Sequence, residues 1–544
     1  MSTFARRTGT ASRLALGTAL AALALLGAAP AVLAETPADT LVIANGIDDL
    51  ISLDPAQAFE FSGLDQINNI YETLVEIDPA TLQPVPGLAE SWTVSEDGQT
   101  FTFKIRQGRV FASGNPVTAK DAAFSIQRAV RLNQSPAFIL TQFGLTPENV
   151  EQTVTAPDDQ TLVLKLDRPY APTFVTNALT AEVGSVVDMQ TVMEHVEGED
   201  FGNAWLSVNS AGSGPYMLRA WKPNESVILE ANPNFDRPVP LKRVFVRHVV
   251  EPATQRLLLE NGDVDIARNI APTDIDAIEA GPNTHMQTEL RGQIYYLSGN
   301  QKNEILAKPQ VMEAIKYLID YEGMANTIVK GTNQVHQSFL PQGFLGAITD
   351  KPYAQNVEKA KQLLAEAGYP QGFAIEILIR NEQERIDIAQ ALQGALAQGG
   401  IQASIRQTTG AEALSIFRAR NHQLTLQTWG PDYPDPNTNA SVFAANADNT
   451  DEGQLTGNLA WRNAYPATET TPMVAEAVVE KDEAKRRALY EEMQRISQKS
   501  SPFAIMFQRS EPAGIRDGVE GFKAGGAVSS AFYWTVTKGG AAAQ

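Results

Sequence analysis

The sequence predicts an α/β protein with two or three domains. Its 544 residues, 43% of them apolar, are enough to form that many complete hydrophobic cores. In the first half of the chain, alternating apolar residues predict strands and hairpins. From about residue 295 onward, short apolar runs alternate with helical patterns, as they do in βα units. No internal repeat interrupts this order.

A hairpin and a helix are the clearest patterns of the first half. Residues 92–106 predict the hairpin, because Asp97-Gly98 is a turn signal and Phe101 opens an alternation of apolar and polar residues. Thr118 predicts the start of the helix, with Asp121 placed to complete a capping box. Further strands are predicted at 41–44 and 162–166, and a tight chain reversal at a domain boundary is predicted at 212–216.

The second half predicts alternating helices and strands. Pro309 is suited to the first turn of a helix, and Gly368 with Pro370 ends another. The predicted helices are 309–319, 357–367, 387–398 and 474–498, and the predicted strands are 375–380, 401–406, 424–426 and 503–507.

The N-terminus has the pattern of a cleavable signal peptide. Arg6, Arg7 and Arg13 precede an apolar run over residues 14–33, and small residues at positions 32 and 34 predict cleavage after Ala34. The alternative is an uncleaved membrane anchor. No later stretch is long and apolar enough to span a bilayer. We therefore expect an exported, soluble protein that is not itself membrane-spanning.

The charge excludes several classes of partner. The formal net charge is −20, and loss of the three leader arginines makes it −23. Such a surface repels nucleic acid and anionic lipid. The chain has no cysteine, so it has no disulfide, no thiolate metal site and no lipidated N-terminal cysteine, which excludes a lipoprotein.

Residues 427–436 are the stretch around which we organise the functional prediction. They follow the apolar run 424–426 and contain three prolines, so the strand is expected to end in a rigid turn. The turn presents Trp429, Asp432 and Tyr433 in fixed positions, and ordered groups of this kind lose little entropy when a ligand binds. The alternative is an acidic surface loop with a structural Asp-Pro turn.

No catalytic motif is visible. The chain lacks a Gly-x-Ser-x-Gly elbow, a Ser-x-x-Lys pair, a His-Glu-x-x-His helix and a phosphate-binding Gly-Lys-Ser/Thr loop. The five histidines have no metal-ligand spacing, although scattered histidines could still converge in space. We expect a protein that is not an enzyme and that carries no cofactor and no metal.

Arg380 and Asp432 together suggest a ligand with both charges. Arg380 ends an alternating apolar strand, where ligands often gather, and its guanidinium can hold a carboxylate by two hydrogen bonds. The alternative is a solvated arginine paired with Glu382 or Glu384. Asp432 can accept hydrogen bonds from an ammonium group. A peptide or a similar zwitterion is the simplest such ligand.

The chain resembles the dipeptide/oligopeptide/nickel family (family 5) of extracellular solute-binding proteins that serve ABC importers. The resemblance runs over almost all of the chain after the leader, and its order and spacing make it specific. It is carried by residues 71–75 (YETLV), 85–92 (VPGLAESW), 97–103 (DGQTFTF), 108–111 (GRVF), 117–121 (VTAKD), 212–216 (GSGPY), 261–266 (NGDVDI), 319–320 (ID) and 360–368 (AKQLLAEAG).

The resemblance implies a two-lobed periplasmic binding protein, a Venus-flytrap of type II in cluster C, with an extra subdomain in the first lobe. Lobe I would comprise 35–84, 203–294 and 502–544, the extra subdomain 85–202, and lobe II 295–501. A ligand would bind between the lobes, and the closed form would be presented to the permease subunits of an ABC importer. We expect a monomer whose ligand is a di- or oligopeptide or another small molecule.

By the same resemblance, Asp432 would take the ammonium of a peptide and Arg380 its carboxylate. Thr428, Trp429 and Gly430 would offer main-chain hydrogen bonds, with Tyr433 beside them in the turn. Phe59, Phe61 and the Trp429 ring would form apolar walls. Pro431, Pro434 and Asp435 make the loop stiffer and more acidic than the family pattern, and Tyr321 stands where a basic residue is common. A non-peptide zwitterion or cation such as an opine, a nickel chelate and, from another class, a secreted hydrolase are the alternatives.

Overall fold

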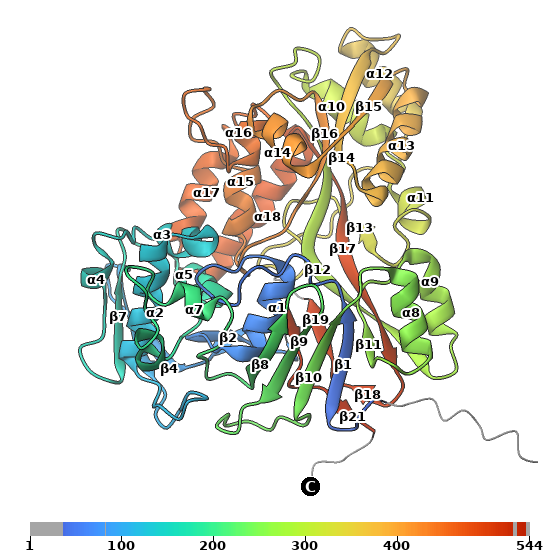
Figure 1. The fold of residues 1–544 in the computed structure, drawn as a ribbon. Coiled ribbons are helices and arrows are strands. Elements are labelled where there is room, and N and C mark those ends of the chain that lie inside the picture. The colour runs from blue at the N-terminus through green and yellow to red at the C-terminus, as the bar shows by residue number, and fades with distance from the viewer. Residues whose placement is uncertain (1–35, 82, 526–529, 540–544) are drawn as a thin grey trace, which may run out of the picture.

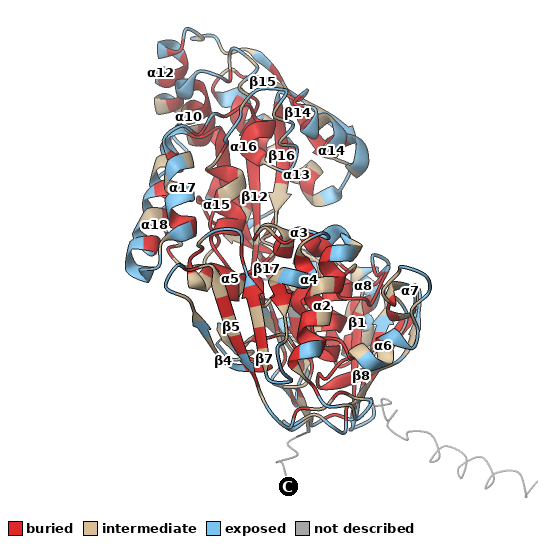
Figure 2. Cartoon of the chain, turned by 90° about the vertical axis from the view of Figure 1, so that its left-hand side faces the viewer, coloured by how far each residue is buried: buried red, intermediate tan, exposed pale blue. Residues whose placement is uncertain are grey.

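The computed structural model describes residues 36–81, 83–525 and 530–539 of the chain. The predicted signal peptide lies outside these residues. Within them, one eleven-stranded mixed sheet extends through a lower and an upper part (Figure 1). Buried residues follow this sheet and the inner faces of the helices, whereas the outer helical faces are exposed (Figure 2). No helix in the described ranges combines the length and the apolar character needed to cross a membrane.

Two long antiparallel strands, β12 and β17, join the lower and upper parts. The sheet order is β15 (Gln402–Thr408), β14 (Ala374–Arg380), β16 (Leu424–Trp429), β12 (Thr284–Gly299), β17 (Phe503–Arg516), β11 (Ile266–Ala267), β1 (Thr40–Asn45), β10 (Arg243–His248), β9 (Ser226–Ala231) and β8 (Tyr216–Lys222), and β13 (Asn333–Val335) also pairs with β17. In the upper part, β15, β14 and β16 are mutually parallel, as the predicted βα units require.

A separate four-stranded antiparallel sheet lies at the lower left of Figure 1. Its order is β4 (Ala89–Val94), β5 (Thr100–Ile105), β7 (Thr161–Lys165) and β6 (Val154–Thr155). The predicted hairpin is confirmed, with Val94 paired to Phe101 and Gly98 at φ +76° in the turn. The helices beside this sheet are α2 (Ala119–Leu132), α3 (Phe138–Thr141), α4 (Val150–Thr153) and α5 (Pro172–Ala178). Phe101 and Phe103 are fully buried in the core between them.

The remaining helices cover the main sheet. In the lower part they are α1 (Phe61–Ile70), α6 (Met189–Met193), α7 (Asn203–Leu206), α8 (Pro252–Glu260) and α9 (Pro272–Glu279), and in the upper part α10 (Pro309–Leu318), α11 (Tyr321–Asn326), α12 (Val357–Glu366), α13 (Gln383–Gln398), α14 (Gly410–Arg418), α15 (Asn437–Phe443), α16 (Leu459–Arg462), α17 (Thr470–Val479) and α18 (Glu483–Ser500). Short 3-10 helices occupy Ser135–Ala137 and Glu182–Gly184. Two-stranded sheets pair β2 (Val75–Ile77) with β3 (Pro84–Pro86), β18 (Val519–Glu520) with β21 (Thr537–Lys538), and β19 (Lys523–Gly525) with β20 (Ser530–Phe532).

Most predicted helix signals are confirmed. The Thr118–Asp121 capping box opens α2, Pro309 starts α10, and Gly368 lies at φ +90° just after α12. The expected helix over 474–498 is instead two helices. The side chain of Asp482 accepts a hydrogen bond from the Lys485 backbone N–H, which caps a new helix at that point.

Two other predictions need correction. Helix α13 begins four residues before the predicted start at 387. The Gly212–Tyr216 stretch bends at Gly214 but forms no tight reversal. Its glycines are required by close packing, since a Cβ at Gly212 would lie 2.1 Å from the carbonyl oxygen of Ile70.

Candidate functional site

The loop after β16 forms one wall of a cavity between the upper part and the rest of the molecule. The cavity has a volume of about 170 Å³. Gly430, Pro431 and Asp432 line it from the upper part. The opposite walls are Ala58, Phe59, Phe61 and Leu64 around the start of α1, together with Pro136, Ile139, Ala181, Glu182 and Val183 from the region of the four-stranded sheet. Three regions distant in sequence therefore meet at Asp432.

The carboxylate of Asp432 is half-buried and has no cationic partner among the described residues. Among the described residues, its carboxylate accepts a side-chain hydrogen bond from Thr438 alone, whose Oγ1 lies 3.4 Å from Oδ2. Burial raises the pKa of Asp432 to about 7, and the Thr438 hydrogen bond opposes this increase. The Asp432 carboxylate is therefore without a counter-ion, and the ammonium group of a ligand can supply one.

Phe59 and Phe61, both named from the sequence, lie on the apolar side of this cavity. Phe61 is 49% exposed, which is unusual for so large an apolar side chain. The ring of Phe59 packs edge-on against Phe138 with centroids 5.9 Å apart. A Cβ placed on Gly430 would meet no atom within 4 Å, so the backbone there is open to the cavity.

The side chains of Thr428, Trp429 and Tyr433 bind other parts of the protein and do not line the cavity. Thr428 Oγ1 accepts a hydrogen bond of 3.0 Å from Arg385. The Trp429 indole N–H donates to Asn439 Oδ1 at 3.2 Å. The Tyr433 hydroxyl donates to Gln142 Oε1 at 3.1 Å, so this buried ring joins the upper part to the region of the four-stranded sheet.

Arg380 lies at the same edge of the sheet as the end of β16, but it lines none of the three cavities described for this structure. Its side chain packs beside Gly410, where a built Cβ would lie 3.7 Å from Arg380 Cδ. The buried Nε of Arg380 has no hydrogen-bond partner in the part of the chain that the structure describes. The predicted charge pair thus has only its Asp432 member in the cavity.

A second cavity of about 370 Å³ adjoins the first, since Phe61 lines both. Its charged lining residues are Asp48, Asp49, Asp65, Arg268, Arg291, Arg509 and Glu511. Arg509 is not among the site residues predicted from the sequence. The available signal was its position two residues after the apolar residues 503–507 of a predicted strand, where a charge needs an explanation.

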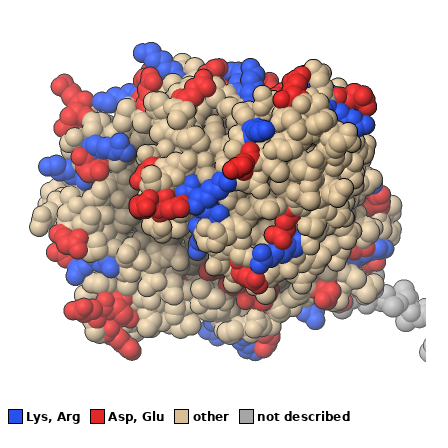
Figure 3. Space-filling view, turned by 90° about the horizontal axis from the view of Figure 1, so that it is seen from above, with Lys and Arg blue, Asp and Glu red and all other residues tan. Residues whose placement is uncertain are grey.

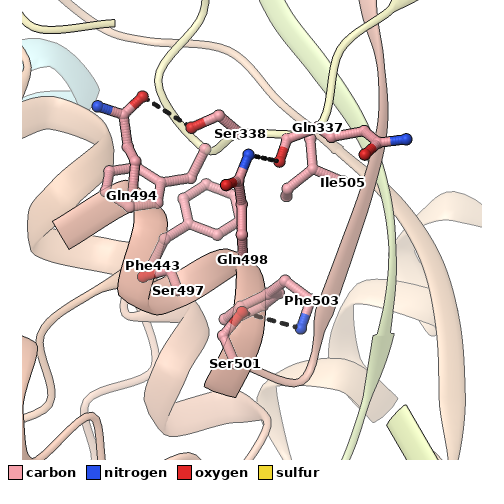
Figure 4. A pocket seen from close by; sticks show the side chains of 10 residues that line it. Gln337, Ser338, Phe443, Gln494, Ser497, Gln498, Ser501, Phe503 and Ile505 are labelled. Carbon is pink, nitrogen blue, oxygen red and sulfur yellow. Dashed lines mark hydrogen bonds between the residues drawn. The ribbon is translucent and has the colours of Figure 1, made fainter. Parts of the chain in front are cut away.

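A third cavity lies inside the upper part and is shown in Figure 4. Its volume of about 10 Å³ is enough for one water molecule and no solute. Ser338 donates to Gln494 Oε1 at 2.7 Å on its wall, while the nearby Ser497 hydroxyl has no hydrogen-bond partner within the described ranges. This cavity is therefore a packing feature and not a ligand site.

The surface seen from above carries mixed charges. Lysines and arginines alternate with aspartates and glutamates over a mostly uncharged face (Figure 3). Within the described ranges, no group of three or more His, Cys, Asp or Glu side chains is arranged to hold a metal ion.

Comparison with known proteins identifies the family. Residues 83–451 match the model of "Bacterial extracellular solute-binding proteins, family 5 Middle". The chain belongs to this family. Its members are binding proteins for transported solutes and not enzymes, and the predicted family and two-lobed α/β fold are confirmed.

Relatives span nearly the whole chain. The probable D,D-dipeptide-binding periplasmic protein DdpA of Escherichia coli is 27% identical, over 92% of this chain and 95% of its own length. The structure of DppA from Helicobacter pylori in complex with the peptide STSA matches with a TM-score of 0.74 and 25% identity, over 92% of this chain and 98% of that one. NikZ from Campylobacter jejuni, in complex with Ni(L-His), has a TM-score of 0.74 over 92% of this chain and 100% of that one, but its 21% identity shows the fold alone.

Proposed function

We propose that this protein captures a short peptide between its two lobes and delivers it to an ABC importer. The observation that carries the proposal is the Asp432 carboxylate, which lines the cavity between the two parts and has no cationic partner among the described residues. A peptide α-ammonium group fits such a site because it supplies both a positive charge and hydrogen-bond donors. The peptide-binding relatives in Escherichia coli and Helicobacter pylori support this choice.

The cavity walls suggest a role for each neighbouring group. Phe59 and Phe61 provide apolar surface for ligand side chains, and the main chain from Thr428 to Gly430 provides donors and acceptors for an extended ligand. The side chains of Trp429 and Tyr433 hold the loop in place through Asn439 and Gln142.

The lobe boundaries belong to the same proposal. Lobe I comprises 35–84, 203–294 and 502–544, the extra subdomain 85–202, and lobe II 295–501. The separate four-stranded sheet and the two connecting strands β12 and β17 support this division. The protein acts as a periplasmic monomer, exported by a signal peptide that is cleaved after Ala34.

The first experiment identifies what the protein carries. Protein purified from its own cells is weighed by native mass spectrometry, and peptide in the bound fraction is sequenced. The second experiment measures the binding of defined di- and tripeptides by calorimetry. Asp432→Ala is expected to abolish this binding without lowering the melting temperature of the ligand-free protein. The matched control is Glu199→Ala, which removes an exposed carboxylate outside the cavity. Unchanged peptide affinity in Asp432→Ala refutes the role of this residue.

A non-peptide zwitterion is the second candidate. The cavity offers the Asp432 carboxylate to an ammonium group and apolar side chains to the rest of the ligand. An opine-like molecule with a charged amine also fits these two requirements. Native mass spectrometry separates the two candidates directly, because a trapped ligand that yields no amino acids on hydrolysis contradicts the peptide assignment.

A further inference from the structure

The second cavity is the feature that the proposed function leaves unused. It borders the Asp432 cavity, because Phe61 lines both. Arg291 also links the two, because its guanidinium lies over the Phe61 ring at 5.7 Å from the centroid. We call the Asp432 cavity the apolar end of this region and the second cavity, around Arg509, its polar end.

The polar end contains more positive than negative buried charge. Arg268 forms ion pairs with Asp65 and Glu511, with its Nη2 2.6 Å from Glu511 Oε1. Arg291 is also paired with Glu511. The Asp65 carboxylate is thus paired with Arg268, and the Glu511 carboxylate is shared between Arg268 and Arg291. The remaining acids of the cavity, Asp48 and Asp49, are exposed.

Arg509 is the arginine left without a carboxylate among the described residues of this cavity. Its side chain is half-buried, and its hydrogen bond is a weak one from Nη1 to Gln293 Oε1 at 3.4 Å. Most of its five N–H donors are therefore available to a ligand.

Arg291, beside Arg509, also has an unused donor, although it is paired with Glu511. Its buried Nε has no hydrogen-bond partner among the described residues. Burial, together with the charges of Arg268 and Arg509, lowers the pKa of Arg291 to about 9. Since Arg291 remains charged at neutral pH, a bound anion would relieve the repulsion among these guanidinium groups.

The local backbone explains how these groups converge. Strand β12 bulges between Leu290 and Ile294, where four residues advance against two of β17. Bulges redirect side chains and often occur beside functional sites. Here the bulge carries Arg291 and Gln293, and it lies opposite Arg509 on β17.

A row of paired residues in the sheet relates the two ends. Trp429, Ile294 and Gln508 lie in one row across three neighbouring strands. Two strand spacings amount to about 10 Å. An extended peptide of two or three residues spans about 7–10 Å. One end of the row precedes the Asp432 loop, and the other adjoins Arg509.

We propose that Arg509, with Arg291 beside it, binds the carboxylate of the peptide whose ammonium group is held by Asp432. This inference rests on the proposed function and gives Arg509 the role that the sequence suggested for Arg380. It also sets the class of ligand as a zwitterion of two or three residues, and not a longer peptide or a simple cation.

Calorimetry on the full mature chain tests the assignment. The probes are dialanine and trialanine in their L and D forms, each as the free acid and as the C-terminal amide. The variants are Arg509→Met and, as a matched control, Arg380→Met. Arg509→Lys is a second variant that keeps the charge but not the forked geometry. Melting temperatures verify that each variant is folded.

The wild-type protein is expected to bind the acid of at least one probe more tightly than its amide. Arg509→Met is expected to lower the affinity for the acid by about 10- to 100-fold, as for loss of a charged hydrogen bond. The affinity for the amide is expected to change less than about twofold. The affinity of Arg509→Lys for the acid is expected to lie between those of the wild type and Arg509→Met. Arg380→Met is expected to leave the acid-to-amide ratio unchanged.

The outcomes separate the two proposals. Equal losses for acid and amide in Arg509→Met, or a selective loss of the acid in Arg380→Met, overturn the Arg509 assignment and leave peptide capture standing. If the wild-type protein binds none of the probes while native mass spectrometry shows a non-peptide ligand, the proposed function is wrong and the assignment fails with it.

Discussion

The two halves of the loop after β16 contain one aspartate each, and these aspartates lie in opposite environments. Gly430 to Asp432 line the cavity, and Asp432 has no cation beside it among the described residues. Tyr433 to Pro436 are packed inward, and Asp435 is fully buried. Its carboxylate forms a bidentate pair with Arg486, at 2.7 and 2.8 Å. It also accepts a 3.3 Å hydrogen bond from Asn177.

The difference shows that a carboxylate becomes available to a ligand when no cation of its own chain reaches it. Asp435 meets Arg486 from α18 and therefore fixes the loop. Asp432, three residues earlier, points to the cleft and is left with the hydroxyl of Thr438. The buried pair holds the backbone still, so the unpaired acid remains at a defined position.

The largest expected effect comes from breaking the buried pair. Arg486→Met leaves the Asp435 carboxylate buried without a counter-ion, which typically costs about 3–5 kcal/mol of unfolding free energy. Denaturant unfolding measures this loss. Arg487→Met is the matched control on the same helix, because the Arg487–Glu483 pair is exposed and is expected to contribute less than about 0.5 kcal/mol. Similar stabilities of the two variants would show that Asp435 does not fix the loop.

A smaller effect is expected from pH at the other half of the loop. Burial raises the pKa of Asp432 to about 7, so the ionised fraction falls as the pH decreases below 7. Affinity for a peptide with a free ammonium group is expected to fall by about tenfold for each pH unit below 7. Calorimetry between pH 5 and 8 measures this slope.

Asp432→Asn is the control for this pH dependence and is expected to remove the slope. The folded-state pKa of Asp432 lies above its unfolded value, so its contribution to stability is present at low pH and is lost as the pH rises through about 7. Asp432→Asn is therefore expected to stabilise the ligand-free protein above pH 7, by an amount on the order of 1 kcal/mol. A variant less stable than wild type at pH 8 would mean that Asp432 has a structural partner.

The smallest expected effect compares the two halves of the loop by the unfolding free energy of one variant from each. Tyr433→Phe removes the hydrogen bond to Gln142 and is expected to cost about 0.5–1.5 kcal/mol, measured by denaturant unfolding. Gly430→Ala is expected to cost less than that, because its Cβ would meet no atom within 4 Å and would project into open space. If Gly430→Ala proved more destabilising than Tyr433→Phe, the first half of the loop would also contribute to stability through packing.

Local patterns were enough to predict most of the fold. The Asp97-Gly98 hairpin, the Thr118–Asp121 capping box and the Pro309 helix start all depend on neighbours within a few residues, and each is confirmed. The split between α17 and α18 was missed although its cause, the Asp482 cap, is also local. A continuous helical pattern on both sides concealed it.

The candidate site was only partly predictable. Asp432, Phe59 and Phe61 were named from the sequence, and the structure brings them to one cavity. Arg380 was named because it ends a strand, but which side chains reach the cleft depends on the packing around them. Arg509 became a candidate only when the pairing of β12 with β17 placed it opposite a bulge.

By itself, the sequence determined the order of strands and helices, the family, and a charged proline-rich loop after β16, because these follow from nearest-neighbour sterics, periodicity and motif spacing. The tertiary structure alone decided which charges are paired. Asp435 and Arg486 are 51 residues apart, and Asp65 and Arg268 are 203 apart. Coulomb interactions depend on distance in space, which the chain order does not contain.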